Sequence, residues 1–204
     1  MTSTTPELRA KDTDTRERLL DAGAELFVRK GFHGCGLSEI LKLASVPKGS
    51  FYHYFSSKEE FGVVLIERTF DAYVAELRPL LANRKMGPRL RLRAIFEWCR
   101  NECAASGPKV ECLITKLALE TSQLSEPLRA AVKCAYQQWA AILAQVIREG
   151  QAANEIDSER DPDRLSNVMV MTWEGAVMRM QIDRNIDPLD DFLLFFDAIV
   201  PATR

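Results

Sequence analysis

Apolar residues recur with helical spacing along nearly the whole chain. The first regular segment has apolar or small residues at positions i, i+3, i+4, i+7 and i+8 before a break near Gly31: Leu19, Ala22, Gly23, Leu26 and Phe27,. Alternating patterns typical of strands are almost absent,. The sequence therefore predicts an all-α fold.

Three further helices are predicted before a first major break. Two short ones are expected over residues 37–44 and 47–54, the second opened by Pro47,. Ser57, followed three residues later by Glu60, has the signature of a capping box, so a long helix should run from there towards Leu81,. Two short helices joined by a tight turn are typical of a helix-turn-helix, expected here at about residues 37–56,.

Glycine and proline breaks divide the remainder. The break before Pro88 separates a DNA-binding domain, residues 13–82, from a regulatory and dimerisation domain, residues 83–204, and residues 1–12 are predicted to be a flexible segment,. The second domain should begin with helices over about 89–105 and 111–122. Three more helices are expected after caps at Ser125, Asp161 and Asp187, and the first of them should end near Ala153,.

The last two predicted helices carry more apolar side chains than one core can use. The segment 189–200 is apolar nearly all round, and such a helix must be covered on all sides,. A deep interior position would satisfy this requirement, but two terminal helices of this kind favour an interface between two copies of the chain. The predicted interface residues are Val168, Trp173, Val177, Phe192 and Phe196.

Composition and charge narrow the function. With 47% hydrophobic and 27% charged residues, the 204-residue chain has the balance of a globular protein,. Its polar start and the lack of a long apolar run predict no secretory signal and no membrane partner, and hence a cytoplasmic location,. The net charge of −2 excludes a wholly basic nucleic-acid binder, but Lys42, Lys48 and Lys58 fall in an acid-free window between Glu39 and Glu59. This window predicts one small contact surface for nucleic acid.

Cysteines and histidines give no metal site. Only His33 and His53 are present, and neither stands at a metal-ligand spacing,. An odd cysteine count without a secretory signal disfavours disulfides. The five cysteines are Cys35, Cys99, Cys103, Cys112 and Cys134. No hydrolase or phosphate-loop motif is present either, so neither an enzyme nor a cofactor is predicted,.

The helix-turn-helix segment carries a recognisable motif. It reads Lys48-Gly49-Ser50-Phe51-Tyr52-His53-Tyr54-Phe55, followed by Ser57-Lys58 at the start of the next helix. With the preceding Lys-Gly-Phe that ends the first helix, this segment resembles the DNA-binding domain of the TetR family of transcriptional regulators. Gly36 and Pro47 depart from the threonine and serine usual in that family, which weakens two helix caps.

The resemblance implies a homodimeric repressor with an N-terminal three-helix helix-turn-helix domain and a C-terminal helical ligand-sensing and dimerisation domain. Its partners would be double-stranded operator DNA and a small-molecule effector. Phe51 and Phe55 should anchor the short second helix, and Gly49 leaves its start bare for close approach to DNA. Lys58 can reach a phosphate from the next helix. Tyr54 can either anchor the short helix or contact a phosphate. The predicted DNA contacts are Ser38, Lys48, Gly49, Ser50, Tyr52, His53, Tyr54 and Lys58.

Two segments of the second domain, Glu111-Cys112-Leu113 and Trp173-Glu174-Gly175-Ala176, resemble a TetR subgroup that includes electrophile-sensing and acrylate-responsive repressors. Cys112 falls in the first turn of a predicted helix, where the helix dipole favours a thiolate, and Lys116 shares its face,. The sequence therefore favours a reactive electrophile sensed at Cys112. In the electrophile-sensing relative the cysteine joins a lysine that aligns with Gln181 here, so a sulfur–nitrogen crosslink at that position is excluded.

A second kind of effector stays open from the sequence. A small metabolite such as a short carboxylate could bind reversibly, with Trp139, Trp173 or Arg179 lining its pocket.

Overall fold

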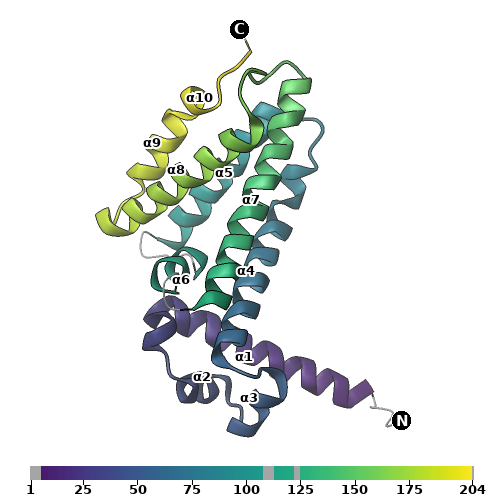
Figure 1. Ribbon diagram of the computed structural model, residues 1–204, viewed down its shortest axis with the longest axis vertical. Helices are drawn as coiled ribbons and strands as arrows, with labels where there is room; N and C mark the ends of the chain where they lie inside the picture. The colour runs from purple at the N-terminus through teal and green to yellow at the C-terminus, as the bar shows by residue number, and fades with distance from the viewer. Residues whose placement is uncertain (1–5, 108–112, 122–124, 204) are drawn as a thin grey trace. The chain divides into compact units, whose positions relative to one another are not determined.

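The computed structural model describes residues 6–107, 113–121 and 125–203, with side chains from residue 14 onwards (Figure 1). Within these ranges the secondary structure consists of helices α1 to α10, and no strand occurs. The all-α prediction is confirmed.

The chain divides into two compact units that are not consecutive in sequence. The N-terminal unit comprises residues 1–71 and 112–133, and the C-terminal unit comprises residues 72–111 and 134–204. This division differs from the predicted boundary at residue 82, because helix α6 packs on α1 and so joins the first unit. Helices α4 and α7 contribute residues to both units.

The N-terminal unit is built around a long first helix. It contains the whole of α1 (Pro6–Gly34), α2 (Leu37–Ala44), α3 (Lys48–Tyr54) and α6 (Leu113–Thr121). It also contains the first parts of α4 (Lys58–Leu81) and α7 (Glu126–Ala152). Helix α1 begins at Pro6, within the segment 1–12 that the sequence predicts to be flexible. The other boundaries lie within a residue or two of the predicted ones.

Local capping explains where α4 begins. The Ser57 hydroxyl accepts a hydrogen bond from the Glu60 N–H at 3.0 Å, as the predicted capping box requires,. The Glu60 carboxylate accepts the Ser56 N–H at 2.7 Å, one residue earlier than the usual reciprocal bond. The Ser56 hydroxyl also donates to this carboxylate, and the two bonds from Ser56, that of the hydroxyl first, lower the pKa of Glu60. The first turn of α4 is thus fixed directly after α3.

The C-terminal unit has an aromatic core. Its own helices are α5 (Pro88–Ser106), α8 (Pro162–Asp183), α9 (Asp187–Leu194) and α10 (Phe196–Ile199). The Phe96 ring lies 5.2 Å from Trp173 and 4.8 Å from Phe192, centroid to centroid. Dispersion and burial of these large rings hold α5, α8 and α9 together.

This packing corrects the predicted dimer interface. The side chains of Trp173, Val177, Phe192 and Phe196 are buried in the core of their own unit, so they do not form a surface. Val168, which is 45% exposed, is the one predicted interface residue that faces outward. The error arose because α8 is apolar on two faces, and a sequence stripe does not show which face points inward.

Two details of the last helices also differ from expectation. Asp161 caps α8 as predicted, accepting the Arg164 N–H at 2.7 Å. Asp187, in contrast, is the first residue of α9, and its own N–H donates to the Asn185 side chain at 3.2 Å. The expected single last helix is interrupted at Phe195. None of the helices in the described ranges is long and apolar enough to cross a membrane.

Candidate nucleic-acid interface

Helices α2 and α3 are joined by the tight turn that the sequence predicted. Ser45 ends α2 in the left-handed conformation, with φ 55°. The Val46 N–H then donates to the Leu41 carbonyl at 3.0 Å, and the Val46 side chain is buried. Pro47, with φ −61°, is already suited to a helix start and leads into α3,. The turn therefore redirects the chain within residues 45–47.

Aromatic packing anchors one face of α3. Phe51 and Phe55 are almost completely buried. The Phe61 ring of α4 lies 5.4 Å from Phe51 and 4.9 Å from Phe55, and it also contacts Phe27 of α1 at 5.9 Å. The predicted anchoring role of Phe51 and Phe55 is confirmed. Because this face is fixed, the orientation of the opposite face is fixed as well.

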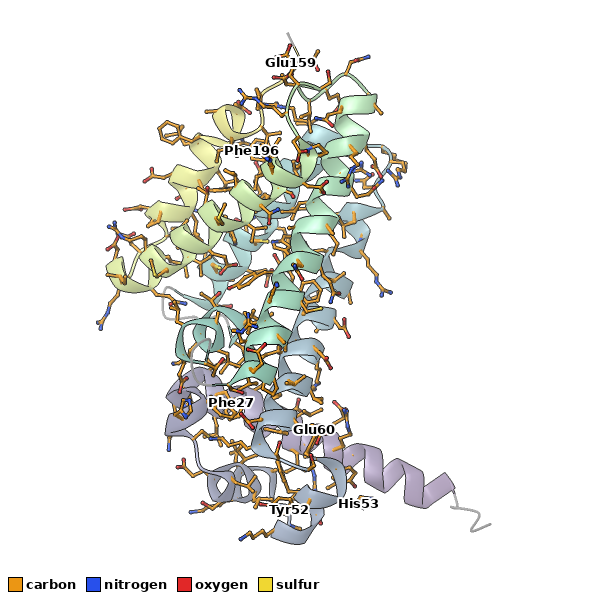
Figure 2. All side chains as sticks on the ribbon, in the orientation of Figure 1. Phe27, Tyr52, His53, Glu60, Glu159 and Phe196 are labelled. Atoms are coloured by element: carbon orange, nitrogen blue, oxygen red, sulfur yellow. The ribbon has the colours of Figure 1, made fainter. Side chains whose placement is uncertain are left out.

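The opposite face of α3 is open to solvent and carries hydrogen-bond donors. Lys48, Tyr52 and His53 are exposed, and Tyr52 keeps 55% of its surface. Tyr52 and His53 are labelled in Figure 2. A Cβ atom at Gly49 would meet no heavy atom of the described chain within 4 Å. Glycine costs about 1 kcal/mol relative to alanine inside a helix, and no internal packing requires it here. A bare backbone at this position fits close approach by an outside molecule.

The remaining predicted contacts lie on α2 and α3. Ser38 is exposed in the first turn of α2, while Ser50 and Tyr54 are half-buried on α3. The Tyr54 ring packs edge-to-face against His53 at 5.0 Å. Among the described residues, no side chain caps the start of α2 or α3, which agrees with the weak caps expected from Gly36 and Pro47.

Lys58 departs from its predicted role. It is the first residue of α4, but its ammonium group donates to the Phe32 carbonyl and lies 4.3 Å from the centroid of the Phe32 ring. Burial lowers the pKa of Lys58. The structure therefore directs this side chain towards the end of α1 and not towards the exposed face of α3.

The described effector residues that the sequence predicted are divided between the two units. Cys112 lies outside the described residues. Lys116 belongs to the N-terminal unit, where its ammonium donates to the Val28 carbonyl. Arg179 is exposed on α8 of the C-terminal unit and pairs with Asp183 at 2.8 Å.

The two tryptophans predicted for an effector pocket do share a cluster. Trp139 and Trp173 are each only 5% exposed, and their rings lie 6.5 and 5.2 Å from that of Phe96. Tyr73 adds a ring 5.3 Å from Trp139. The cluster forms part of the core of the C-terminal unit.

Two of the described thiols are held in the protonated form. Burial raises the pKa of Cys99 to about 12, although its contact with the Tyr73 hydroxyl at 2.9 Å opposes the shift. Burial also raises the pKa of Cys35. Such thiols are poor nucleophiles because little thiolate is present near neutral pH.

Within the described ranges, no three His, Cys, Asp or Glu side chains form a group that could hold a metal ion.

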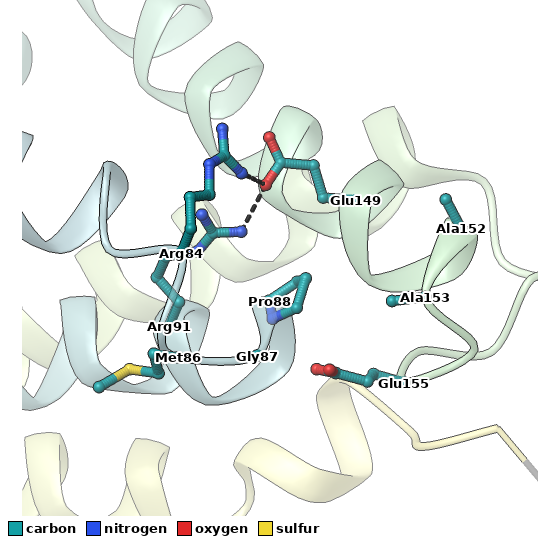
Figure 3. A pocket seen from close by; sticks show the side chains of 9 residues that line it. All are labelled: Arg84, Met86, Gly87, Pro88, Arg91, Glu149, Ala152, Ala153 and Glu155. Atoms are coloured by element: carbon teal, nitrogen blue, oxygen red, sulfur yellow. Dashed lines mark hydrogen bonds and ion pairs between the residues drawn. The ribbon is translucent and has the colours of Figure 1, made fainter.

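A pocket of about 530 Å³ lies in the C-terminal unit, and Trp139, Trp173 and Arg179 are not among the residues that line it (Figure 3). Arg84 and Arg91 both bind the Glu149 carboxylate there. Burial alone would raise the pKa of Glu149, but the hydrogen bonds from these two arginines outweigh it and hold the pKa below its usual range. Arg91 is 1% exposed and also donates to the Leu81 carbonyl at 3.0 Å. Since Arg91 joins the end of α4 to α5 and α7, this feature is a structural tie.

Sequence reasoning missed one set of contacts near the helix-turn-helix. The Glu120 carboxylate of α6 accepts the N–H groups of Phe32 and His33 at 2.8 and 2.6 Å. The partners lie 87 and 88 residues apart, so no local pattern could have paired them.

Comparison with known proteins gives matches over most of the chain. The family described as "Bacterial regulatory proteins, tetR family" matches residues 19–61, which contain α2 and α3. The family described as "Tetracyclin repressor-like, C-terminal domain" matches residues 88–196.

Individual relatives match almost end to end. The chain is 38% identical over 187 residues to the HTH-type transcriptional repressor NemR of Escherichia coli, covering 92% of this chain and 94% of NemR. It is 33% identical to the repressor DhaR of a Mycobacterium strain, covering 94% and 96% of the two chains. It is also 38% identical to the transcriptional regulator AcuR of Cereibacter sphaeroides, covering 88% and 82%. The solved structure of E. coli NemR in its reduced form superposes with a TM-score of 0.83 at 37% identity, covering 92% of this chain and 98% of that one.

Proposed function

The chain belongs to the TetR family of bacterial transcriptional regulators, and from this premise we propose that it represses transcription by holding operator DNA with the exposed face of α3 and releases that DNA in response to a small effector. Regulators of this family bind operator DNA and act as dimers, and they are not enzymes.

The observation that carries the DNA-binding proposal is the division of α3 into two faces. Phe51 fixes the helix from inside, while Lys48, Gly49 and Tyr52 are open on the outside. A lysine and a tyrosine offer donors to phosphates, and the bare glycine lets the backbone come close. Two such helices in a dimer would enter successive major grooves if they stood about 34–36 Å apart.

Retention of DNA fragments tests this assignment. Purified wild-type protein should retain a small set of genomic fragments, which would also identify the regulated genes. A Tyr52→Ala variant should lose them at the same protein concentration. A Lys85→Ala variant, which removes an exposed lysine from the C-terminal unit, should behave like wild type. Retention of the same fragments by Tyr52→Ala would show that α3 is not the reading helix.

We infer that a second copy of the chain covers the outer face of α8. Val168, Met171, Met178 and Ile182 are all exposed, and Gly175 lies between them with no heavy atom of the described chain near its missing Cβ. At 3.6 residues per turn these positions fall within about a quarter of the helix circumference. Such a stripe of apolar side chains flanking a small residue suits close packing of two helices.

Charge placed on this face tests the interface. Met171→Glu should give folded monomers, because an unpaired charge is not tolerated at an apolar interface. Operator affinity should fall with dimerisation, since a monomer reads one half-site. Leu90→Glu is the matched control, because Leu90 is 61% exposed on α5 and lies off the stripe. An intact Met171→Glu dimer in sedimentation would place the interface elsewhere.

We propose further that the effector is a reactive electrophile sensed at Cys112, immediately before α6. Two observations support Cys112: burial disfavours the thiolate at Cys35 and Cys99, and NemR, a relative 38% identical, has a solved structure described as the reduced form. The Cys112 thiolate would attack an activated alkene, forming a carbon–sulfur bond as the alkene π bond breaks. The neighbouring carbon then takes a proton from water.

N-ethylmaleimide is a suitable probe of this chemistry. It should release wild-type protein from operator DNA, while Cys112→Ser stays bound at the same dose. Cys134→Ser removes an exposed thiol from α7 and should respond like wild type. Release of Cys112→Ser from operator DNA would show that the Cys112 thiol is not the sensor and would favour the reversible alternative.

The reversible alternative has one observation in its favour. Trp139 and Trp173 meet around Phe96 in the core of the C-terminal unit, and such a cluster could accept the apolar part of a small carboxylate,. Arg179 is a poor candidate for the carboxylate partner because it is exposed and paired with Asp183. A reversible effector would be lost on dialysis, whereas an alkylated protein would stay off DNA.

Either effector must favour a form that binds DNA poorly. A hundredfold difference in operator affinity corresponds to about 2.7 kcal/mol of coupling between the two sites. Helix α4 contributes residues to both units and begins directly after α3, so it offers a continuous path between them.

A further inference from the structure

Helix α1 is broken near its end, and the break deprives backbone groups of their usual partners within the helix. Gly31 has φ 76° and ψ 174°, far from helical values,. In an unbroken helix the Phe32 N–H would bond to the Val28 carbonyl four residues earlier. The geometry at Gly31 is incompatible with that bond, so a donor and an acceptor need other partners.

Helix α6 supplies both partners. The Glu120 carboxylate accepts the Phe32 and His33 N–H groups at 2.8 and 2.6 Å, one with each oxygen. The Lys116 ammonium, one helical turn earlier, donates to the Val28 carbonyl. We call Lys116 and Glu120, with these backbone groups, the α1–α6 clasp. It replaces a broken helical hydrogen bond with two charged side chains from another helix.

The fit around Gly31 shows how closely the carboxylate is seated. A Cβ atom built on Gly31 would lie 2.3 Å from a Glu120 carboxylate oxygen. The positive φ also favours glycine at this position. The contacts to successive N–H groups form a small anion-binding concavity, which a carboxylate fills well.

Phe32 connects the clasp to α4. Glu120 holds the N–H of Phe32, and Lys58, the first residue of α4, holds the carbonyl of Phe32. Glu120 also favours the charged form of Lys58, against the burial that lowers its pKa. The inward position of Lys58 is therefore part of the same arrangement. Helix α2, which packs on α1, begins just beyond it.

From these contacts we propose that Lys116 and Glu120 are positioning residues for operator binding. They hold the end of α1, and with it Lys58 and the start of α4, in the arrangement that presents α3 to DNA. Any rearrangement of α6 would reach the helix-turn-helix through the backbone of residues 28–33. This proposal rests on the proposed function for its consequence, but the clasp itself can be tested without DNA.

Amide hydrogen exchange tests the clasp in the free protein. Glutamine has a single acceptor oxygen, so Glu120→Gln leaves Phe32 or His33 without its partner. Exchange at these amides should quicken about tenfold or more, while the helix content stays unchanged. If Glu120→Gln fails to fold, Lys116→Met is the second variant to measure. It retains an apolar side chain but frees the Val28 carbonyl, and it should have a similar local effect. Glu67→Gln, at an exposed site on α4, is the matched control.

Operator affinity tests the positioning role. Glu120→Gln should weaken binding about tenfold, and Lys58→Met should add little to this loss, because both changes act through Phe32. A merely structural role would give additive losses. Unchanged exchange at Phe32 and His33 would overturn the clasp whatever happens with DNA. Faster exchange with unchanged operator affinity would overturn the positioning role. If wild-type protein retained no DNA, the proposed function would fail, and the exchange result would still decide whether the clasp exists.

Discussion

Replacing Gly49 by alanine should strengthen the fold and weaken operator binding at the same time. Alanine is favoured over glycine by about 0.8–1 kcal/mol in a helix interior, and by less at the second residue of a helix such as α3,. The new Cβ atom would meet no heavy atom of the described chain within 4 Å, so no packing penalty opposes the gain. We expect about 0.5 kcal/mol, which for a chain of this size raises the unfolding midpoint by about 1–2 °C.

The same methyl group should cost DNA affinity. It would project from the exposed face of α3, where close approach of a phosphate or base edge requires a bare backbone. Loss of one good contact, worth about 1–3 kcal/mol, weakens binding by about tenfold or more. Because dimers unfold at concentration-dependent temperatures, the midpoints must be compared at one protein concentration. Affinity is best followed by fluorescence anisotropy with a retained operator fragment.

Gly34 provides the matched control for this experiment. It ends α1, and a Cβ atom there would make only an ordinary contact of 3.7 Å with Lys30. Gly34→Ala should therefore leave operator affinity unchanged. If Gly49→Ala lowered the midpoint, the helical environment described for α3 would be wrong. If it stabilised the protein but bound DNA as tightly as wild type, DNA would not approach this part of α3.

Three further predictions concern stability. Phe192→Glu should unfold the C-terminal unit instead of giving clean monomers, because Phe192 is 3% exposed; circular dichroism would distinguish this from the folded monomer expected of Met171→Glu,. Ser57→Ala should lower the unfolding free energy, measured by urea denaturation, by about 1 kcal/mol because the cap on α4 is lost,. An unchanged denaturation midpoint would show that this cap does not stabilise the protein. Glu149→Gln should destabilise the protein by about 1–3 kcal/mol at neutral pH, because buried Arg91 loses its charged partner,. Since the folded-state pKa of Glu149 is lowered, its contribution is present above the unfolded pKa of about 4.3 and lost as pH falls through the folded value, so the difference from wild type should shrink in acid,.

Much of the fold was predictable because its boundaries depend on local signals. Ser57 and Asp161 cap α4 and α8 at the expected positions, and Pro47 precedes α3. The buried face of α3 was also predictable, since Phe51 and Phe55 stand four residues apart on one helix face,. These features depend on residues close together in sequence.

The errors concern the direction of side chains and contacts between distant segments. Trp173 and Val177 were expected at an interface, but α8 is apolar on both faces and only packing against α5 and α9 decides which is inside. Lys58 was expected to reach a phosphate, yet its long apolar stem lets the ammonium turn back to Phe32,. Glu120 joins residues 87 and 88 positions away. Spacing along one helix carries no information about such partners.

The most direct test of the central claim is the salt dependence of operator binding. Each phosphate contact contributes a slope of about −0.9 to a plot of log affinity against log salt concentration. Wild-type protein should give a steep line. Lys48→Ala should reduce the slope by about one for each copy of Lys48 that contacts a phosphate, or about two in a dimer. A flat wild-type line would contradict binding through phosphate contacts, and an unchanged slope for Lys48→Ala would contradict the assignment of α3 as the helix that holds the operator.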